Sequence, residues 1–328
     1  MSFSGFVVQL LNGLAGASSL FLVAAGLSLI FGVTRIVNFA HGSFFMVGIY
    51  VAYSLVATLG GTVGFWPALL LAALAVGVLG ALVEVLLLRR IYRAPELFQL
   101  LATFALGLVI KDGVLWFWGP EELLGPRAPG LTGSVSILGR QFPSYDLFLI
   151  VAGPVVLGLL WLLLTKTRWG TLVRAATQDR EMVSALGVNQ AWLFTAVFAL
   201  GALLAGLGGA LQLPREPANL EMDLNIIGAA FVVVVVGGMG SIPGAYVAAL
   251  LIAELKAICI WLGLVEIWGV SISFSKLTLV VEFLVMAVVL VARPWGLFGR
   301  PQATSRHAGT AEEPLRPPDR LYKFGGAA

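Results

Sequence analysis

Long apolar stretches with few charges run through the whole chain, and they limit its possible folds more than any other feature. A helix needs about 20 apolar residues to cross the hydrocarbon core of a bilayer, which is about 30 Å thick. The stretches lie at about 6–30, 42–58, 65–88, 98–118, 145–165, 191–213, 226–240, 243–264 and 276–292. They predict an all-α, polytopic integral membrane protein with about nine transmembrane helices, of which the second and seventh are short.

The composition excludes a soluble fold and most catalytic chemistry. Of the 328 residues, 59% are hydrophobic and 11% charged, against about 45–50% and about 25% in soluble domains. One cysteine and two histidines, His41 and His307, provide neither a disulfide framework nor a metal site. The sequence also lacks the G-x-x-x-x-G-K-[ST] loop and the G-x-S-x-G and H-E-x-x-H motifs. We therefore expect no enzyme activity, no cofactor and no nucleic-acid partner.

Basic residues are divided unequally between the two sides of the predicted membrane domain. One side carries fourteen lysines and arginines, and the other carries three: Arg127, Arg140 and Arg215. The fourteen are Arg35, Arg89, Arg90, Arg93, Lys166, Arg168, Arg174, Arg180 and the six that follow residue 292. Because positively charged loops are retained in the cytosol, this side and the C-terminus are predicted to be cytoplasmic. The uncharged N-terminal segment is then external, and its first apolar stretch is predicted to be a retained helix.

The predicted organisation is a transmembrane domain over residues 1–292 followed by a tail over 293–328. An external loop at 119–144 contains several prolines and is too polar to cross lipid. A second long loop, at 166–190, lies on the cytosolic side. The tail has too little apolar content to offset its ordering entropy, so it is predicted to be disordered in the cytosol.

The cytosolic loop at 166–190 has the pattern of a helix–turn–helix. Its apolar residues at helical spacing are Trp169, Leu172, Val173 and Ala176. Asp179 is suited to cap a second helix, with Glu181 in its first turn, and Gly187 is suited to end that helix in the left-handed conformation. By periodicity alone the first helix could equally lie on lipid headgroups with its arginines facing phosphates.

Polar residues within the apolar stretches are candidates for a transport pathway. Arg35, Asn38 and His41 recur at three-residue intervals, which would align them on one face of a helix. There they either line a water-accessible route or cap the first helix. Glu254, the deepest charge, either contacts the ammonium group of a substrate or forms a buried pair with a lysine of the same bundle or of a partner chain.

Six charges in all, Glu84, Lys111, Asp112, Glu254, Lys256 and Glu282, lie within or at the rims of the stretches. They are expected to face protein or water, and Glu84 is predicted at the interface. The segment Gly237–Gly244 contains Gly238, Gly240 and Ser241. It is either a re-entrant turn beside the pathway or a tight cytosolic hairpin.

Three blocks of sequence, in this order, resemble one transporter family. They are Asn38–Gly48 (NFAHGSFFMVG), Asp179–Asn189 (DREMVSALGVN) and Gly237–Ala245 (GGMGSIPGA). They are similar to permeases of the high-affinity branched-chain amino acid family, the LivH type, over residues 5–299. The second block keeps the glutamate-to-glycine spacing with which such permeases contact their ATPases, with Met182 and Val183 in place of two alanines.

The resemblance implies a subunit of an ABC importer in the bacterial inner membrane. Its partners would be the lipid bilayer, a second related permease, two cytosolic ATPases that bind the ATP, and a periplasmic binding protein. The residues that would couple to the ATPases are Arg174, Asp179, Arg180, Glu181, Ala185, Leu186 and Gly187. The cargo would be branched-chain or other hydrophobic amino acids, carried by alternating access.

Two alternatives remain open from the sequence. Close relatives of this family carry urea or short amides, and the permease sequence does not separate these cargoes. The other is an ion-coupled secondary transporter in which Glu254 and Glu282 carry protons. It differs from the importer in one observable property, because its uptake would survive ATP depletion while a proton gradient remained.

Overall fold

The computed structural model describes residues 2–61, 63–92, 94–267 and 270–299. Eight helices of this part are long and apolar enough to cross a membrane. They are α1 (Phe3–Thr34), α2 (His41–Leu59), α3 (Phe65–Val83) with its continuation to Ile91, α5 (Glu96–Trp118), α6 (Ser144–Lys166), α9 (Gln190–Ala210), α11 (Ile242–Leu262) and α12 (Phe274–Ala292). A ninth apolar helix, α10 (Met222–Gly237), has 16 residues. The prediction of a polytopic helical membrane protein is confirmed, and the seventh predicted crossing, α10, is the shortest of these nine apolar helices.

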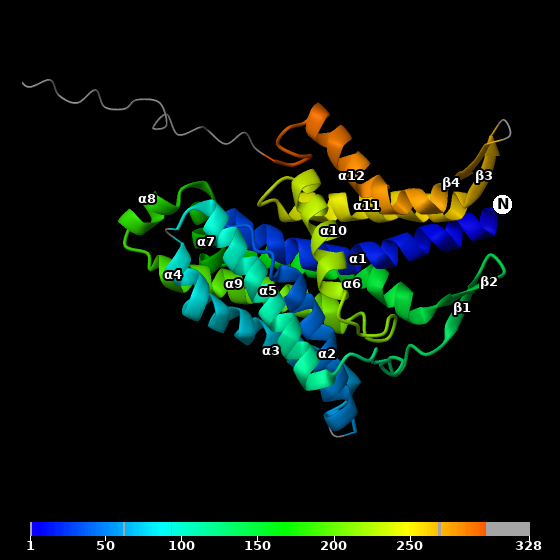
Figure 1. The fold of residues 1–328 in the computed structure, drawn as a ribbon, viewed down its shortest axis with the longest axis horizontal. Helices are drawn as coiled ribbons and strands as arrows, with labels where there is room; N and C mark the ends of the chain where they lie inside the picture. Colours follow the sequence, from blue (N-terminus) through cyan, green and yellow to red (C-terminus); the bar gives the residue numbers. More distant parts are fainter. Residues whose placement is uncertain (1, 62, 93, 268–269, 300–328) are drawn as a thin grey trace, which may run out of the picture.

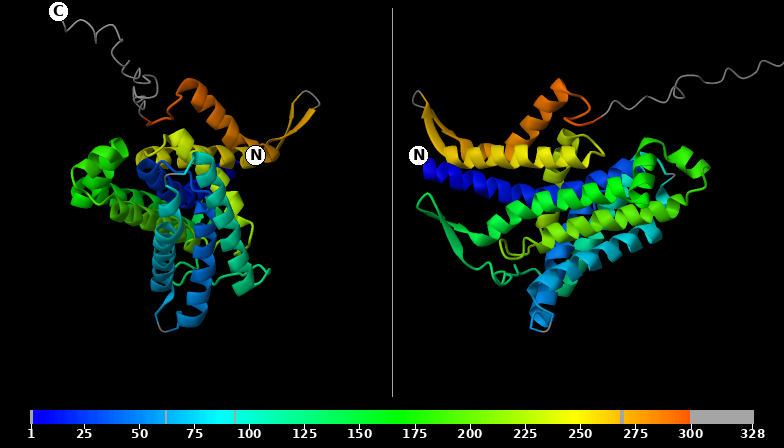
Figure 2. Two further views of the ribbon diagram at one scale, coloured as in Figure 1. Left: turned by 60° about the vertical axis from the view of Figure 1, so that its left-hand side comes forward. Right: turned by 180° about the vertical axis from the view of Figure 1, so that it is seen from behind.

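Helix α1 forms the centre of the bundle and is the most buried of the long helices. It packs against α6, α9, α10 and α11, and α9 in turn packs against α2 and α3 (Figure 1). Helix α12 lies at the edge, where it contacts α10 and α11 and leaves its apolar surface uncovered by this chain. Two further views show the same order, with α12 outside α11 (Figure 2).

Small residues allow the central helices to approach closely. A Cβ atom at Gly201 of α9 would overlap the side chain of Ile30 in α1, and one at Gly209 would overlap the backbone carbonyl of Phe45 in α2. Ala205 lies between these two glycines in a stripe of small residues at four-residue spacing and is fully buried. The stripe is therefore a helix-packing face, since small residues at this spacing let two helix backbones approach closely.

Short helices gather at one end of the bundle. They are α4 (Arg89–Ile91), α7 (Arg168–Gln178) and α8 (Arg180–Ala185), and a π-helical turn, Glu84–Leu88, precedes α4. The start of α1 and two β-hairpins lie toward the opposite end (Figure 1). The two ends of the molecule are therefore built differently.

The two hairpins are the elements that helical periodicity did not predict. Strands β1 (Ser134–Ile137) and β2 (Arg140–Pro143) are antiparallel, with Ser134 opposite Pro143, and they lie in the predicted external loop. Leu138 and Gly139 form their two-residue turn with φ of 49° and 79°, the type I′ geometry that suits hairpins. Strands β3 (Leu264–Ile267) and β4 (Val270–Ser273) pair between α11 and α12. The predicted disorder of the tail falls mostly on residues 300–328, outside the described part.

Candidate functional site

The loop between α6 and α9 folds into a compact unit, here called the knob (residues 167–189). Thr167 begins it by accepting a hydrogen bond on Oγ1 from the backbone N–H of Gly170 at 3.0 Å, which caps α7. Helix α7 then buries Gly170, Val173 and Ala176 and packs against α6, α1 and α9. The predicted amphipathic helix is confirmed, and its apolar side contacts the protein.

The second helix of the knob has the ends that its sequence predicts. Asp179 accepts a hydrogen bond on Oδ1 from the backbone N–H of Met182 at 2.9 Å. Gly187 ends the helix with φ of +85°, the left-handed conformation. The side chains of Arg180 and Glu181 lie outside the described part of the structure.

The tip of the knob exposes apolar side chains at the end of the molecule where the short helices gather. Met182 is 58% exposed and Leu186 is 76% exposed, whereas Val183 between them is buried. Arg174 and Ala185 are also exposed. A small apolar tip surrounded by polar and basic residues is suited to insertion into a groove of another protein.

One contact fixes the knob to the centre of the bundle. The Arg35 side chain donates a hydrogen bond from Nη2 to the backbone carbonyl of Thr177 at 2.8 Å, near the end of α7, where a cation is favoured by the helix dipole. Arg35 itself ends α1 with φ of 60°.

This geometry corrects the prediction that Arg35, Asn38 and His41 share a helical face. The left-handed residue at position 35 stops α1, and residues 35–38 are not helical. The Arg35 side chain therefore reaches the knob, while Asn38 and His41 are fully buried in the bundle.

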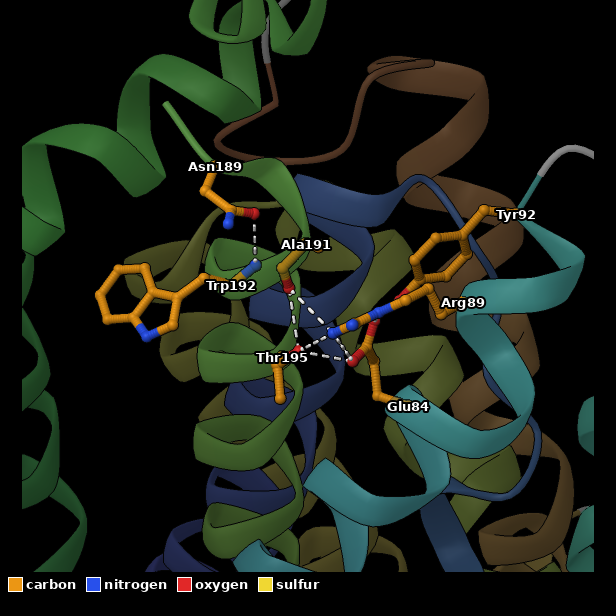
Figure 3. Close-up of polar contacts among 7 residues, drawn as sticks. All are labelled: Glu84, Arg89, Tyr92, Asn189, Ala191, Trp192 and Thr195. Carbon is orange, nitrogen blue, oxygen red and sulfur yellow. Dashed lines mark hydrogen bonds and ion pairs between the residues drawn. The ribbon is translucent and has the colours of Figure 1, made fainter. Parts of the chain in front are cut away.

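A second contact network fixes the start of α9 to α3 (Figure 3). Glu84 accepts hydrogen bonds from Arg89 Nη2 at 3.1 Å, from the Tyr92 hydroxyl at 3.0 Å and from Thr195 Oγ1 at 2.6 Å. Arg89 also donates to Thr195 Oγ1 at 2.6 Å and to the backbone carbonyl of Ala191 at 3.3 Å. The network joins α3 to α9 at Thr195, which is six residues beyond the last residue of the knob.

Glu84 faces protein groups, as expected of a charge in an apolar stretch. The side chain is completely buried inside the protein. The π-helical turn that it begins has one residue more per hydrogen-bonded ring than an α-helix, and Arg89, Tyr92 and Thr195 meet its carboxylate there. Burial and the adjacent Glu84 carboxylate raise the pKa of Tyr92 above its usual range, so its hydroxyl remains a hydrogen-bond donor.

Asn38 and His41 keep unpaired polar atoms deep in the bundle. The Asn38 side chain accepts from the backbone N–H of Ala40 at 3.1 Å, and His41 Nε2 lies 3.0 Å from the carbonyl of Val23. Within the described chain, Asn38 Nδ2 and His41 Nδ1 have no hydrogen-bond partner. Buried groups of this kind are uncommon and are enriched at functional sites.

The turn at Gly238–Ser241 lies at the knob end of the bundle. Gly238 and Gly240 have positive φ, and Ser241 caps α11 by accepting from the backbone N–H of Gly244 at 3.1 Å. A Cβ at Gly240 would contact Gly32 near the end of α1 and the methyl group of Thr177 in the knob. The position favours the hairpin over the re-entrant turn.

Charges within the helices form pairs across helix interfaces. Lys111 in α5 lies 3.6 Å from Asp223 in α10, and Lys256 in α11 pairs with Glu282 in α12. Among the described residues, Glu254 has no ion pair, and its Oε1 lies buried against Gly13 of α1. The predicted lysine partner of Glu254 is therefore absent from this part of the chain, because the nearby Lys256 is engaged by Glu282. Asp112 is exposed on α5.

The fold is that of a polytopic helical membrane protein, and the knob, a pair of short helices, lies at one end of its bundle. Among the described residues, no group of three histidines, cysteines or acidic residues could hold a metal ion. The family model for the permease component of branched-chain amino acid transport systems matches residues 9–290. The chain belongs to this family.

Individual relatives agree with the family assignment. The permease protein BraD of Pseudomonas aeruginosa is 28% identical over 90% of this chain and 97% of its own length. LivH of Escherichia coli is 26% identical over 90% of this chain and 96% of its own length. LivM of the same organism, also a branched-chain amino acid permease protein, is 23% identical over 89% and 71%. No solved structure matches the chain significantly.

Proposed function

We propose that the chain is the membrane subunit of an ATP-driven importer that moves branched-chain or other hydrophobic amino acids into the cytoplasm. The observation that carries this proposal is the knob, a pair of short helices with an exposed tip, capped at Thr167 and Asp179 and ended at Gly187. A short rigid element of this kind transmits the movement of a bound partner, whereas a flexible loop would absorb it.

The partners follow from the two ends of the molecule and from the relatives. The complex would contain two cytosolic ATPases. The knob would contact an ATPase through the exposed Met182 and Leu186 and the residues around them. A second permease would complete the membrane part, and similarity to both LivH and LivM supports such a pair. A soluble binding protein would deliver the cargo at the opposite end. In this arrangement the protein lies in the inner membrane with its C-terminus in the cytoplasm.

Movement of the knob would reach the bundle by three routes. Arg35 joins it to α1, the Glu84 network joins the start of α9 to α3, and the chain itself continues from the knob into α9. Because α1 and α9 form the centre of the bundle, a push on the knob would tilt both together. Such a rigid-body movement is the physical basis of alternating access.

The pathway itself would be lined by polar groups that this chain leaves unpaired. Asn38 and His41 are the main candidates, since each has one buried polar atom without a partner in the described chain. Glu254 is a further candidate, and Gly238, Gly240 and Ser241 would lie at the cytosolic exit.

Alanine at Asn38 and His41 should lower uptake more than it lowers the amount of assembled transporter. Unchanged uptake would remove both residues from the pathway.

Energy dependence provides the functional test. In cells that express the complete transporter, uptake of labelled leucine should stop when ATP is depleted, even while a proton gradient is maintained. It should persist when an ionophore collapses the gradient and ATP is kept high. The opposite pattern would indicate an ion-coupled transporter and would overturn the proposal.

A further inference from the structure

A polar cavity of about 590 Å³ opens at the end of the bundle opposite the knob. Its wall combines the loop after α5, the β1–β2 hairpin, the start of α6 and the segment after α9. The Tyr145 hydroxyl holds two of these parts together by donating to the backbone carbonyl of Leu211 at 2.7 Å. The cavity falls in the size range of pockets that bind small ligands, so a single side chain also fits.

The charges in the cavity favour a carboxylate. Two of the three basic residues predicted on the external side, Arg127 and Arg215, line it, while the third, Arg140, does not. Arg215 Nε lies 2.8 Å from Asp146 Oδ1, so this pair is neutral. None of the four ion pairs in the described chain includes Arg127. The cavity therefore has a net positive charge, because Arg127 is exposed and Asp146 is already engaged.

Neutral donors complete the lining. Thr132 contributes a hydroxyl group and Gln141 an amide. Ser134 Oγ donates to Gln141 Oε1 at 2.8 Å, which fixes the amide so that its NH₂ group stays available as a donor. An arginine together with amide and hydroxyl donors is a typical arrangement for holding a carboxylate.

We propose that this cavity receives an acidic side chain of the soluble substrate-binding partner, a proposal that rests on the importer function above. A free amino acid would need a carboxylate in the wall for its ammonium group, and the one present, Asp146, is neutralised by Arg215. A single acidic side chain needs only the positive charge and the donors. Arg127 then fixes the orientation in which the partner docks and increases its rate of encounter.

Charge reversal at matched positions tests the proposal. The complete permease–ATPase complex is placed in nanodiscs, and the affinity of its own binding protein is measured together with ATP hydrolysis. Arg127→Glu should weaken binding by about tenfold or more, since it replaces an attraction with a like-charge repulsion. Arg127→Lys, which keeps the charge, should retain most of the affinity, and wild-type affinity should fall as salt is raised.

Arg140→Glu is the control, because this exposed external arginine lies outside the cavity and contacts Ser2 Oγ at 3.1 Å. It should leave binding nearly unchanged, and neither reversal should alter ATP hydrolysis in the absence of the binding protein. Equal effects of the two reversals would overturn the proposal. So would a loss of free leucine binding in Arg127→Glu with partner affinity unchanged. A wild-type complex that hydrolyses ATP but never binds the soluble protein would instead refute the importer function, and the docking proposal with it.

Discussion

Gly187→Val should abolish uptake by the assembled transporter while ATP hydrolysis continues. Gly187 has φ of +85°, a conformation in which a β-branched residue is strained by about 1–3 kcal/mol. Relief of that strain would change the end of α8 and displace the exposed Leu186 beside it. The variant is measured by leucine uptake and ATP hydrolysis in the same proteoliposomes.

Gly187→Asn is the matched control, since asparagine adopts the left-handed conformation more readily than other residues with a side chain. It should retain most of the uptake. Apart from the adjacent residues, no atom of the described chain lies within 4 Å of a Cβ at this position, so we attribute a difference between the two variants to the backbone and not to a clash. Coupled transport by Gly187→Val at the wild-type rate would contradict a coupling role for the end of α8.

Glu84→Ala should cause the largest loss of stability of any single change near the knob. It removes the acceptor for Arg89, Tyr92 and Thr195 and leaves Arg89 without its counter-ion. Breaking a buried pair by removing one partner costs about 3–5 kcal/mol. Arg89 is 38% exposed and regains some water, so we expect a loss of about 2–3 kcal/mol. Thermal unfolding of the purified chain in detergent measures it.

Two control variants show whether the loss of stability comes from this network or from any substitution in the region. Glu84→Gln keeps an acceptor for Tyr92 and Thr195 and should lose less stability than Glu84→Ala. Arg90→Ala changes an exposed neighbour and should have little effect. If Glu84→Ala unfolds at the same temperature as Arg90→Ala, the network does not fasten α9 to α3.

The features that local chemistry determines could be predicted from the sequence. Membrane helices follow from the length of apolar stretches, and the cap at Asp179 and the left-handed Gly187 follow from the preferences of those residue types at helix ends. The amphipathic face of α7 follows from the spacing of Val173 and Ala176. Each of these depends on residues within one or two helical turns.

Features that depend on distant contacts could not be predicted in this way. The Glu84 cluster requires Thr195, which is 111 residues away in the sequence, so the nearby arginines alone could not indicate it. In the same way, Lys256 pairs with Glu282 across two helices and is not available to Glu254. The three-residue spacing of Arg35, Asn38 and His41 indicated one helix face, because nothing local predicts a left-handed arginine at position 35.

Site-specific cross-linking tests the central claim, that separate ATPase subunits bind the knob. Leu186→Cys adds a thiol at the exposed tip, while the natural Cys259 is buried. Leu138→Cys, in the turn of the β1–β2 hairpin and 58% exposed, serves as the control at the other end. In membranes that contain the complete transporter, a short thiol-to-amine cross-linker should join Leu186→Cys to an ATPase subunit and leave Leu138→Cys unlinked. Absence of an ATPase adduct at position 186, in a transporter that still takes up leucine, would contradict the account.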